Sequence, residues 1–304
     1  MVPKDKNWII SFPGLPDLLL SSTGLVSLEL RRVPHSWYIS PDAMVTHLSA
    51  LTRLESLILG FKFRRSRPDR ESRRSPPPIR TIIPALTRFK FEGATEYAED
   101  LVTRIDTLRL DNLDITFFPE TVLDISNLSQ FISRRVPKFQ TPDEARVTFS
   151  YDYITAKLFF PAAGHERFVL GILGDESARR LSSFIHLCRP FLPAFARVER
   201  LYIYQYGNRR QRWEDMFHWQ AWQDFPLLLY FFTHAKDLYV SSEVTTYIVP
   251  FLKHLVGERT TEVLPALQNL FLHKGLSGHT DIEDFIAARE LSGQPIVVSR
   301  WISH

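Results

Sequence analysis

The sequence predicts an α/β fold, an irregular leucine-rich-repeat solenoid in which strand–loop–helix units stack into a horseshoe-like array. The first observation is residues 263–276 (VLPALQNLFLHKGL), where Leu267, Leu270 and Leu272 follow the order L-x-x-L-x-L. The last two leucines are two residues apart, as one face of a short strand requires. The second observation is that this frame recurs, starting at residues 25, 54, 86, 110, 198, 235 and 267. Most starts are 24 to 37 residues apart, and one interval of 88 is close to three repeats of about 29.

Each repeat contributes three apolar residues to the predicted core. They are Leu25/Leu28/Leu30, Leu54/Leu57/Leu59, Leu86/Phe89/Phe91, Leu110/Leu113/Ile115, Val198/Leu201/Ile203, Ala235/Leu238/Val240 and Leu267/Leu270/Leu272. No boundary between domains is needed, because a solenoid grows by stacking. A single domain over residues 1–304 is therefore expected.

The first repeats follow the order strand, loop, helix, strand. Strands are expected at 25–30 and 54–59. Ser40 is the predicted N-cap of the helix between them, Pro41 suits its first position, and Asp42 lies near the positive end of its dipole. The apolar stripe of this helix consists of Met44, Leu48 and Leu51.

Residues 62–80 interrupt the pattern with a basic segment rich in Ser, Arg and Pro. The segment carries eight Lys/Arg and two acids, so its charge is +6 and the rest of the chain is −3. We expect a disordered, solvated loop insertion. A nuclear-import patch or a phosphate-binding loop is the functional alternative. Base stacking is unsupported because no aromatic residue lies between the arginines Arg64, Arg65, Arg67, Arg70, Arg73 and Arg74.

The middle of the chain continues the pattern less regularly. Strands are predicted at 82–91 and 108–118, with a helix capped by Thr95 between them, and residues 130–135 close another helical segment. Residues 145–150 and 154–159 both alternate, and they form either a hairpin or a repeat strand followed by an extra strand. A helix at 177–188 places Cys188 in the core rather than at a reactive site.

The last third predicts a strand at 198–204, a helix from Ser242 kinked at Pro250, and a final strand at 296–298. Thr280 and Glu283 form a predicted capping box for the last helix, which Gly293 and Pro295 end. The spacing of the aromatic residues between these strands suits the buried face of a helix. They are Trp213, Trp219, Trp222 and Phe225.

Composition and motifs point away from catalysis. The sequence has 12 glycines and one cysteine, and it lacks the G-x-S-x-G, H-E-x-x-H and glycine-rich phosphate-loop patterns. We therefore expect no enzyme, no cofactor and no metal site. No apolar run approaches the roughly 18 residues of a membrane span, and residues 1–11 lack a signal-peptide pattern. These features predict a cytoplasmic or nuclear protein.

The predicted binding surface is the concave face, formed by strand residues that alternate with the buried ones. Its N-terminal part consists of Ser27/Glu29/Arg31, Ser56/Ile58, Arg88/Lys90/Glu92 and Asn112/Asp114/Thr116. Its C-terminal part consists of Arg200/Tyr202/Tyr204, Asp237/Tyr239/Ser241 and Asn269/Phe271/His273. Tyr and Arg are enriched at interface hot spots, so a partner is expected on the C-terminal part. The alternative is that residues 213–232 cover these aromatic side chains.

The chain resembles the leucine-rich-repeat region of fungal (basidiomycete) F-box proteins. The segments that carry the resemblance are ISPDAMVTHLSALTRLESLILGF, EDLVTRIDTLRLDNLDITFF, DEARVTF, and VGERTTEVLPALQNLFL with FIAARELSGQPIVVSRW. The resemblance implies the target-binding part of an SCF-type ubiquitin ligase receptor, in which an F-box grips a Skp1 adaptor. Repeats begin here by Leu25, which leaves no room for an F-box before them. The chain is thus a fragment, a truncated gene model or a relative without an F-box.

The expected function is a non-catalytic protein-recognition module that acts as a monomer on a protein target. A Skp1-type adaptor is an expected partner only if an F-box lies upstream, and no membrane partner is expected. Binding of nucleic acid or another anion through residues 62–80 is the alternative function. Its affinity would fall steeply with salt, unlike that of a packed protein interface.

Overall fold

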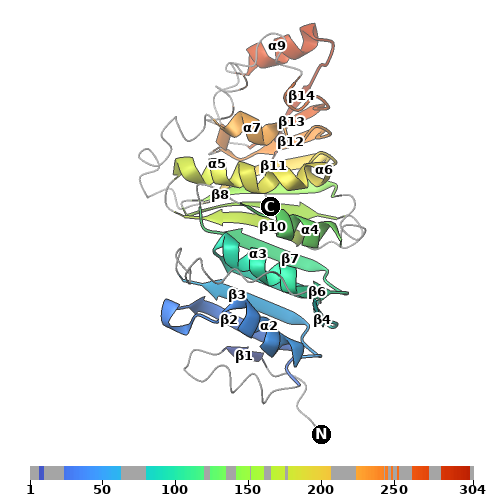
Figure 1. Cartoon of the computed structure of the whole chain (residues 1–304). Helices are drawn as coiled ribbons and strands as arrows, with labels where there is room; N and C mark the ends of the chain where they lie inside the picture. The colour runs from blue at the N-terminus through green and yellow to red at the C-terminus, as the bar shows by residue number, and fades with distance from the viewer. Residues whose placement is uncertain are drawn as a thin grey trace. The chain divides into compact units, whose positions relative to one another are not determined.

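The computed structural model describes residues 7–9, 24–62, 80–119, 124–134, 142–150, 152–160, 166–174, 177–206, 224–242, 244, 245, 248, 252, 262–273 and 282–301 (Figure 1). The chain divides into two compact units. Unit 1 comprises residues 1–118, 122–139 and 167–169, and unit 2 comprises residues 119–121, 140–166 and 170–304. A stack whose repeats contact only their neighbours can divide in this way, so one repeat domain over residues 1–304 stays a prediction.

The sheet of unit 1 contains the four predicted repeat strands and one strand that was not predicted, β1. Its order is β1 (Asn7–Ile9), β2 (Ser27–Val33), β3 (Ser56–Phe61), β5 (Arg88–Gly93) and β7 (Asn112–Phe117). All neighbours pair in parallel, and the register aligns Leu28 with Leu57, Leu57 with Phe89, and Phe89 with Leu113. Two short strands, β4 (Thr81–Ile83) and β6 (Ile105–Thr107), form a separate parallel pair. Each repeat strand therefore starts about two residues after the first leucine of its frame.

The helices of unit 1 are α2 (Pro41–Ser49), α3 (Thr95–Arg104) and α4 (Ser126–Ser133), with a short 3₁₀ turn η1 (His35–Trp37) before them. In Figure 1 all three helices lie on the same side of the sheet. They cover the side to which the frame residues point. Unit 1 is thus a parallel strand–helix array, as the order of predicted elements indicated.

The helix starts of unit 1 test three predictions. Ser40 is the N-cap of α2 as predicted, because its hydroxyl accepts the N–H of Ala43 at 3.2 Å. The prediction for Thr95 is wrong: Ala94 is the N-cap, its backbone is extended, and Thr95 is already helical. The helical segment that residues 130–135 were predicted to close is α4, which begins at Ser126 and ends at Ser133.

The start of α4 is capped from another helix. Its own N-cap, Ile125, makes no side-chain bond. Instead the carboxylate of Glu99 in α3 accepts the N–H groups of Asn127 at 2.9 Å and Leu128 at 2.8 Å. Burial raises the pKa of Glu99, while these two bonds act to lower it. Glu99 satisfies donors that a helix start would otherwise leave unpaired, so it fixes α4 against α3.

The sheet of unit 2 has the order β10 (Glu166–Leu173), β9 (Tyr153–Phe159), β8 (Glu144–Ser150), β11 (Arg200–Tyr206), β12 (Asp237–Val240), β13 (Asn269–His273) and β14 (Val297–Trp301). Strands β8, β11, β12, β13 and β14 pair in parallel, whereas β9 is antiparallel to β8. Both alternatives for residues 145–150 and 154–159 hold in part. The two segments form a hairpin, β8–β9, and β8 also takes the position of a repeat strand beside β11.

The interval of 88 residues does not contain three further repeats of the same kind, so that expectation is corrected. It holds the hairpin β8–β9 and a strand that was not predicted, β10. Gly171 lies inside β10. The architecture is mixed α/β, with a parallel array interrupted by an antiparallel strand.

The helices of unit 2 are α5 (Ser177–Cys188), α6 (Leu192–Phe195), α7 (Phe225–Leu229) and α9 (Glu283–Leu291), with a 3₁₀ turn η4 (Arg189–Phe191). Helix α5 is confirmed, and Cys188 is fully buried, which raises the pKa of its thiol. The described residues of the helix predicted from Ser242 are helical, with Val244, Ile248 and Leu252 buried. Pro250 lies outside the described residues, and so do Trp213, Trp219 and Trp222.

The start of α9 differs from the prediction, whereas its end agrees with it. The capping box is wrong, because the N-cap is Ile282 and it makes no side-chain bond. Glu283 is therefore the first helical residue, where its side chain cannot take the third-position role of a capping box. Gly293 has a φ of 73° just after the helix, which is the left-handed conformation that ends helices. The predicted end at Gly293 is confirmed.

The predicted core is confirmed in both units. Every residue of the repeat frame is at most 7% exposed. The apolar frame therefore marks the side of each strand that packs under the helices. The other side of each strand, defined here as the open face, carries the residues predicted for binding.

Candidate functional site

The open face of unit 2 is organised in rows that run across the strands. The register places Glu144, Arg200, Asp237 and Asn269 in one row. The next row contains Arg146, Tyr202, Tyr239 and Phe271. A third row contains Thr148, Tyr204, His273 and Trp301. Because strands in parallel register lie about 4.8 Å apart, equivalent side chains of neighbouring repeats meet face to face.

The central row is an aromatic ladder. The ring centroids of Tyr202 and Tyr239 are 4.2 Å apart with planes 10° from parallel. Those of Tyr239 and Phe271 are 4.3 Å apart with planes 6° from parallel. Such pairs add about 0.5–1.5 kcal/mol each beyond the area that they bury. The ladder is a rigid, amphipathic surface, because each stacked ring restricts the side-chain conformation of the next ring.

Arg146 ends the ladder with a positive charge. Its guanidinium carbon lies 5.5 Å from the centroid of Tyr202 and 4.5 Å from that of Phe159. Its Nε also donates to Glu144 at 2.6 Å. A planar cation between two rings is attracted by their negative faces. Arg146 and Glu144 were not predicted for the binding face, although both lie in or beside the alternating segment 145–150.

Ion pairs and one hydrogen bond from a side-chain amide connect the residues of the polar row. Arg200 donates to Asp143 at 2.5 Å and lies 3.6 Å from Glu144. Asn269 Nδ2 donates to Asp237 Oδ1 at 2.7 Å. Burial, with the charge of Glu144 and the neighbouring Tyr239, raises the pKa of Tyr202 to about 12. The tyrosines of the ladder thus remain neutral hydrogen-bonding groups at physiological pH.

Trp301 of β14 covers part of the ladder. Its ring centroid lies 5.5 Å from that of Tyr239, 6.0 Å from Tyr204 and 5.8 Å from His273, with planes at 61° to 87°. Its Nε1 donates to the carbonyl oxygen of Val240 at 3.2 Å. The alternative left open by the sequence was that residues 213–232 cover these aromatic side chains. Residues 213–223 lie outside the described residues, and Trp301 was not predicted.

Two residues predicted for the binding face are buried, and those assignments are corrected. Ser241 is 7% exposed, and its hydroxyl accepts the N–H of Gln205 at 3.2 Å. Ile58 is 6% exposed, and in the register it lies between Glu29 and Lys90, whose long side chains flank it. The other predicted residues of unit 2, Arg200, Tyr202, Tyr204, Asp237, Tyr239, Asn269, Phe271 and His273, are all half-buried on the open face.

The open face of unit 1 is polar by comparison. The row that corresponds to the ladder consists of Glu29, Ile58, Lys90 and Asp114. Lys90 donates to Asp114 at 2.5 Å. The two units therefore present different chemistry at equivalent strand positions, and among the described residues of these two rows the aromatic side chains all belong to unit 2.

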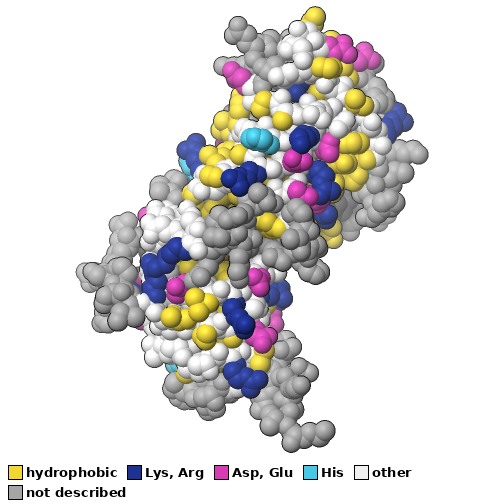
Figure 2. Space-filling model, turned by 90° about the vertical axis from the view of Figure 1, so that its right-hand side faces the viewer, with side chains coloured by type: hydrophobic (Ala, Val, Ile, Leu, Met, Phe, Trp, Pro, Cys, Tyr) yellow, Lys and Arg dark blue, Asp and Glu magenta, His cyan; other side chains and the backbone are white. Residues whose placement is uncertain are grey.

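The basic arginines predicted as an alternative site, Arg64, Arg65, Arg67, Arg70, Arg73 and Arg74, lie outside the described residues. At the end of this segment, Arg80 donates its Nε–H to the carbonyl of Thr103 at 3.1 Å. Figure 2 shows basic and acidic side chains interspersed over the visible face of the described residues.

The part of the chain that the structure describes contains no group of three or more His, Cys, Asp and Glu side chains arranged to hold a metal ion. Within the same residues, no helix is long and apolar enough to cross a membrane. The chemistry of the open face is that of stacking, hydrogen bonding and ion pairing.

Comparison with protein-family models, with curated proteins and with solved structures found no match.

Proposed function

We propose that this chain is a non-catalytic protein-recognition module of the leucine-rich-repeat type, and that the open face of unit 2 binds a protein target. The observation that carries the proposal is the ladder Tyr202–Tyr239–Phe271, with Arg146 at one end. Tyrosine and arginine anchors dominate the binding energy of many interfaces, because tyrosine buries a large area with little loss of side-chain entropy and arginine makes several directed hydrogen bonds. The polar row beside them supplies the hydrogen-bonding rim that such anchors need.

The resemblance to fungal F-box proteins extends this proposal. In that group the repeats hold the target of an SCF-type ubiquitin ligase, and an F-box recruits the Skp1 adaptor. We infer the same target-holding role for this chain, acting in the cytoplasm or nucleus. Adaptor binding would require an F-box in the same polypeptide.

The double variant Tyr202→Ala/Tyr239→Ala tests the proposal. It removes two rungs of the ladder, so we expect target capture from fungal cell extract to fall by at least about 30-fold, the size of one strong hot spot of about 2 kcal/mol. Quantitative mass spectrometry of proteins bound to the immobilised chain measures the loss. The melting temperature of the variant shows whether the fold is intact.

The matched control is Lys90→Ala/Asp114→Ala, which removes an ion pair from the open face of unit 1. We expect this control to retain target capture. Unchanged capture by the tyrosine variant would contradict the proposed site. Capture that depends on nuclease-sensitive material and falls steeply between about 50 and 200 mM salt would favour nucleic-acid binding instead.

A further inference from the structure

Trp301 occupies a defined position on the open face of unit 2. Its ring stands edge-on to Tyr202, Tyr204, Tyr239 and His273, with centroid distances of 5.5 to 6.2 Å. Its indole N–H donates to the backbone carbonyl of Val240. Four ring contacts and one directed hydrogen bond specify an indole, because a phenyl ring could make the ring contacts but could not donate the bond.

The position exists because β12 ends early. Strand β12 stops at Val240, and the next residue is the small Ser241, whose hydroxyl accepts the N–H of Gln205. The row that continues from Tyr204 to His273 therefore lacks a large side chain between them. The carbonyl of Val240, at the end of the strand, accepts the indole N–H. The site that Trp301 fills is thus formed by β11, β12 and β13, and it needs β14 only for its occupant.

Trp301 belongs to β14, which is the least buried strand of the repeat array of unit 2. Strand β14 is the last strand in the sheet order and is hydrogen-bonded to β13 alone. None of its residues is fully buried, and Val297 is 61% exposed. Helix α9, which precedes it, buries only Phe285 and Arg289. Segments with few buried contacts open at a lower free energy than the core. Trp301 can therefore leave without unfolding the strands beneath it.

We propose that this position is a subsite for a tryptophan of the bound target, and that Trp301 is its intramolecular occupant. The target would present an extended segment whose indole stands edge-on to Tyr204, Tyr239 and His273 and donates to Val240. Docking would then require β14 to release Trp301, so the C-terminal strand competes with the target. This inference rests on the proposed function and names the chemistry of its partner.

The full chain with Trp301→Ala tests the subsite, with N-acetyl-L-tryptophanamide as the probe. Emptying the position leaves a ring-lined cavity, and such cavities bind ligands of matching shape. We expect saturable binding by titration calorimetry, about tenfold tighter than that of N-acetyl-L-phenylalaninamide, which lacks the donor. The wild type should bind the probe at least about tenfold more weakly, because Trp301 competes with it. Equal binding of both probes, or no binding by the folded variant, would overturn the subsite.

Hydrogen exchange in the wild type keeps the proposal testable if Trp301→Ala fails to fold. Millimolar N-acetyl-L-tryptophanamide should accelerate exchange of the amides of β14 and leave those of β12 and β13 unchanged. Unaltered exchange of β14 at saturating probe would count against displacement. The outcomes separate the two proposals: loss of target capture in Tyr202→Ala/Tyr239→Ala without probe binding refutes the subsite alone. Probe binding with unaltered target capture refutes the proposed function.

Discussion

Leu57→Asp and Leu270→Asp should each unfold the unit to which the residue belongs. Both side chains are fully buried, Leu57 in β3 and Leu270 in β13. An aspartate there would place a charge in the apolar core without a partner, while also removing the packed leucine. We expect a loss of more than about 4 kcal/mol in the free energy of unfolding, a loss that few single substitutions reach. Circular dichroism during urea or thermal unfolding measures it.

Matched controls place the same charge on an accessible residue near each site. Ser56→Asp lies beside Leu57 on the open face, and Gln268→Asp lies on the exposed residue before β13. Both controls should remain within about 0.5 kcal/mol of the wild type, as surface substitutions usually do. A folded Leu270→Asp protein with wild-type stability would refute the repeat frame for unit 2.

The repeat frame could be predicted because it is a local pattern. Alternation along each strand is set by backbone geometry, so Leu28 and Leu30 must share a side whatever the rest of the chain does. The strand ends were less predictable, because the first residue of each frame lies before its strand and not within it. The hairpin β8–β9 and the strand β10 depended on long-range pairing, which alternation alone does not specify.

The candidate site was predicted in part for the same reason. Tyr202, Tyr239 and Phe271 occupy equivalent frame positions, so their alignment follows once the strands stack in register. Trp301 could not be placed, because its position depends on where β12 ends and on the small Ser241 that follows. The helix starts show a similar limit: Glu99 caps α4 from 27 residues before Ser126. Local capping rules do not include such tertiary caps.

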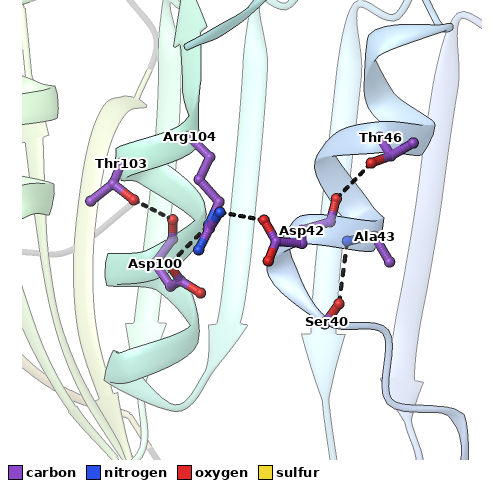
Figure 3. A network of polar contacts seen from close by, with 7 residues as sticks. All are labelled: Ser40, Asp42, Ala43, Thr46, Asp100, Thr103 and Arg104. Carbon is purple, nitrogen blue, oxygen red and sulfur yellow. Dashed lines mark hydrogen bonds and ion pairs between the residues drawn. The ribbon is translucent and has the colours of Figure 1, made fainter. Parts of the chain in front are cut away.

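A buried arginine connects two helices of unit 1 (Figure 3). Arg104 of α3 is 5% exposed. Its Nε donates to Asp100, one turn earlier in α3, at 2.9 Å. Its Nη1 donates to Asp42 at the start of α2. Asp42 therefore has two roles, since it also lies in the first turn of α2, where a negative charge is favoured.

The two carboxylates differ from the arginine in their exposure. The side chains of Asp42 and Asp100 are 52% and 43% exposed. Each single replacement by asparagine should therefore cost only about 1 kcal/mol, because water screens the charge and the other carboxylate still pairs with Arg104. The main energetic cost of this ion-pair cluster is the burial of the charged guanidinium of Arg104. That group needs at least one of the two carboxylates as a partner.

The double variant Asp42→Asn/Asp100→Asn should lose about 3 kcal/mol of unfolding free energy, more than the two single losses together. It leaves Arg104 buried without an anionic partner, which is the costly way to break a buried ion pair. Adding Arg104→Met should recover most of that loss, because methionine fills a similar space without a charge. Urea unfolding of the single, double and triple variants measures the coupling. Additive single losses, or no recovery in the triple variant, would show that Arg104 is stabilised by its packing and not by the two carboxylates.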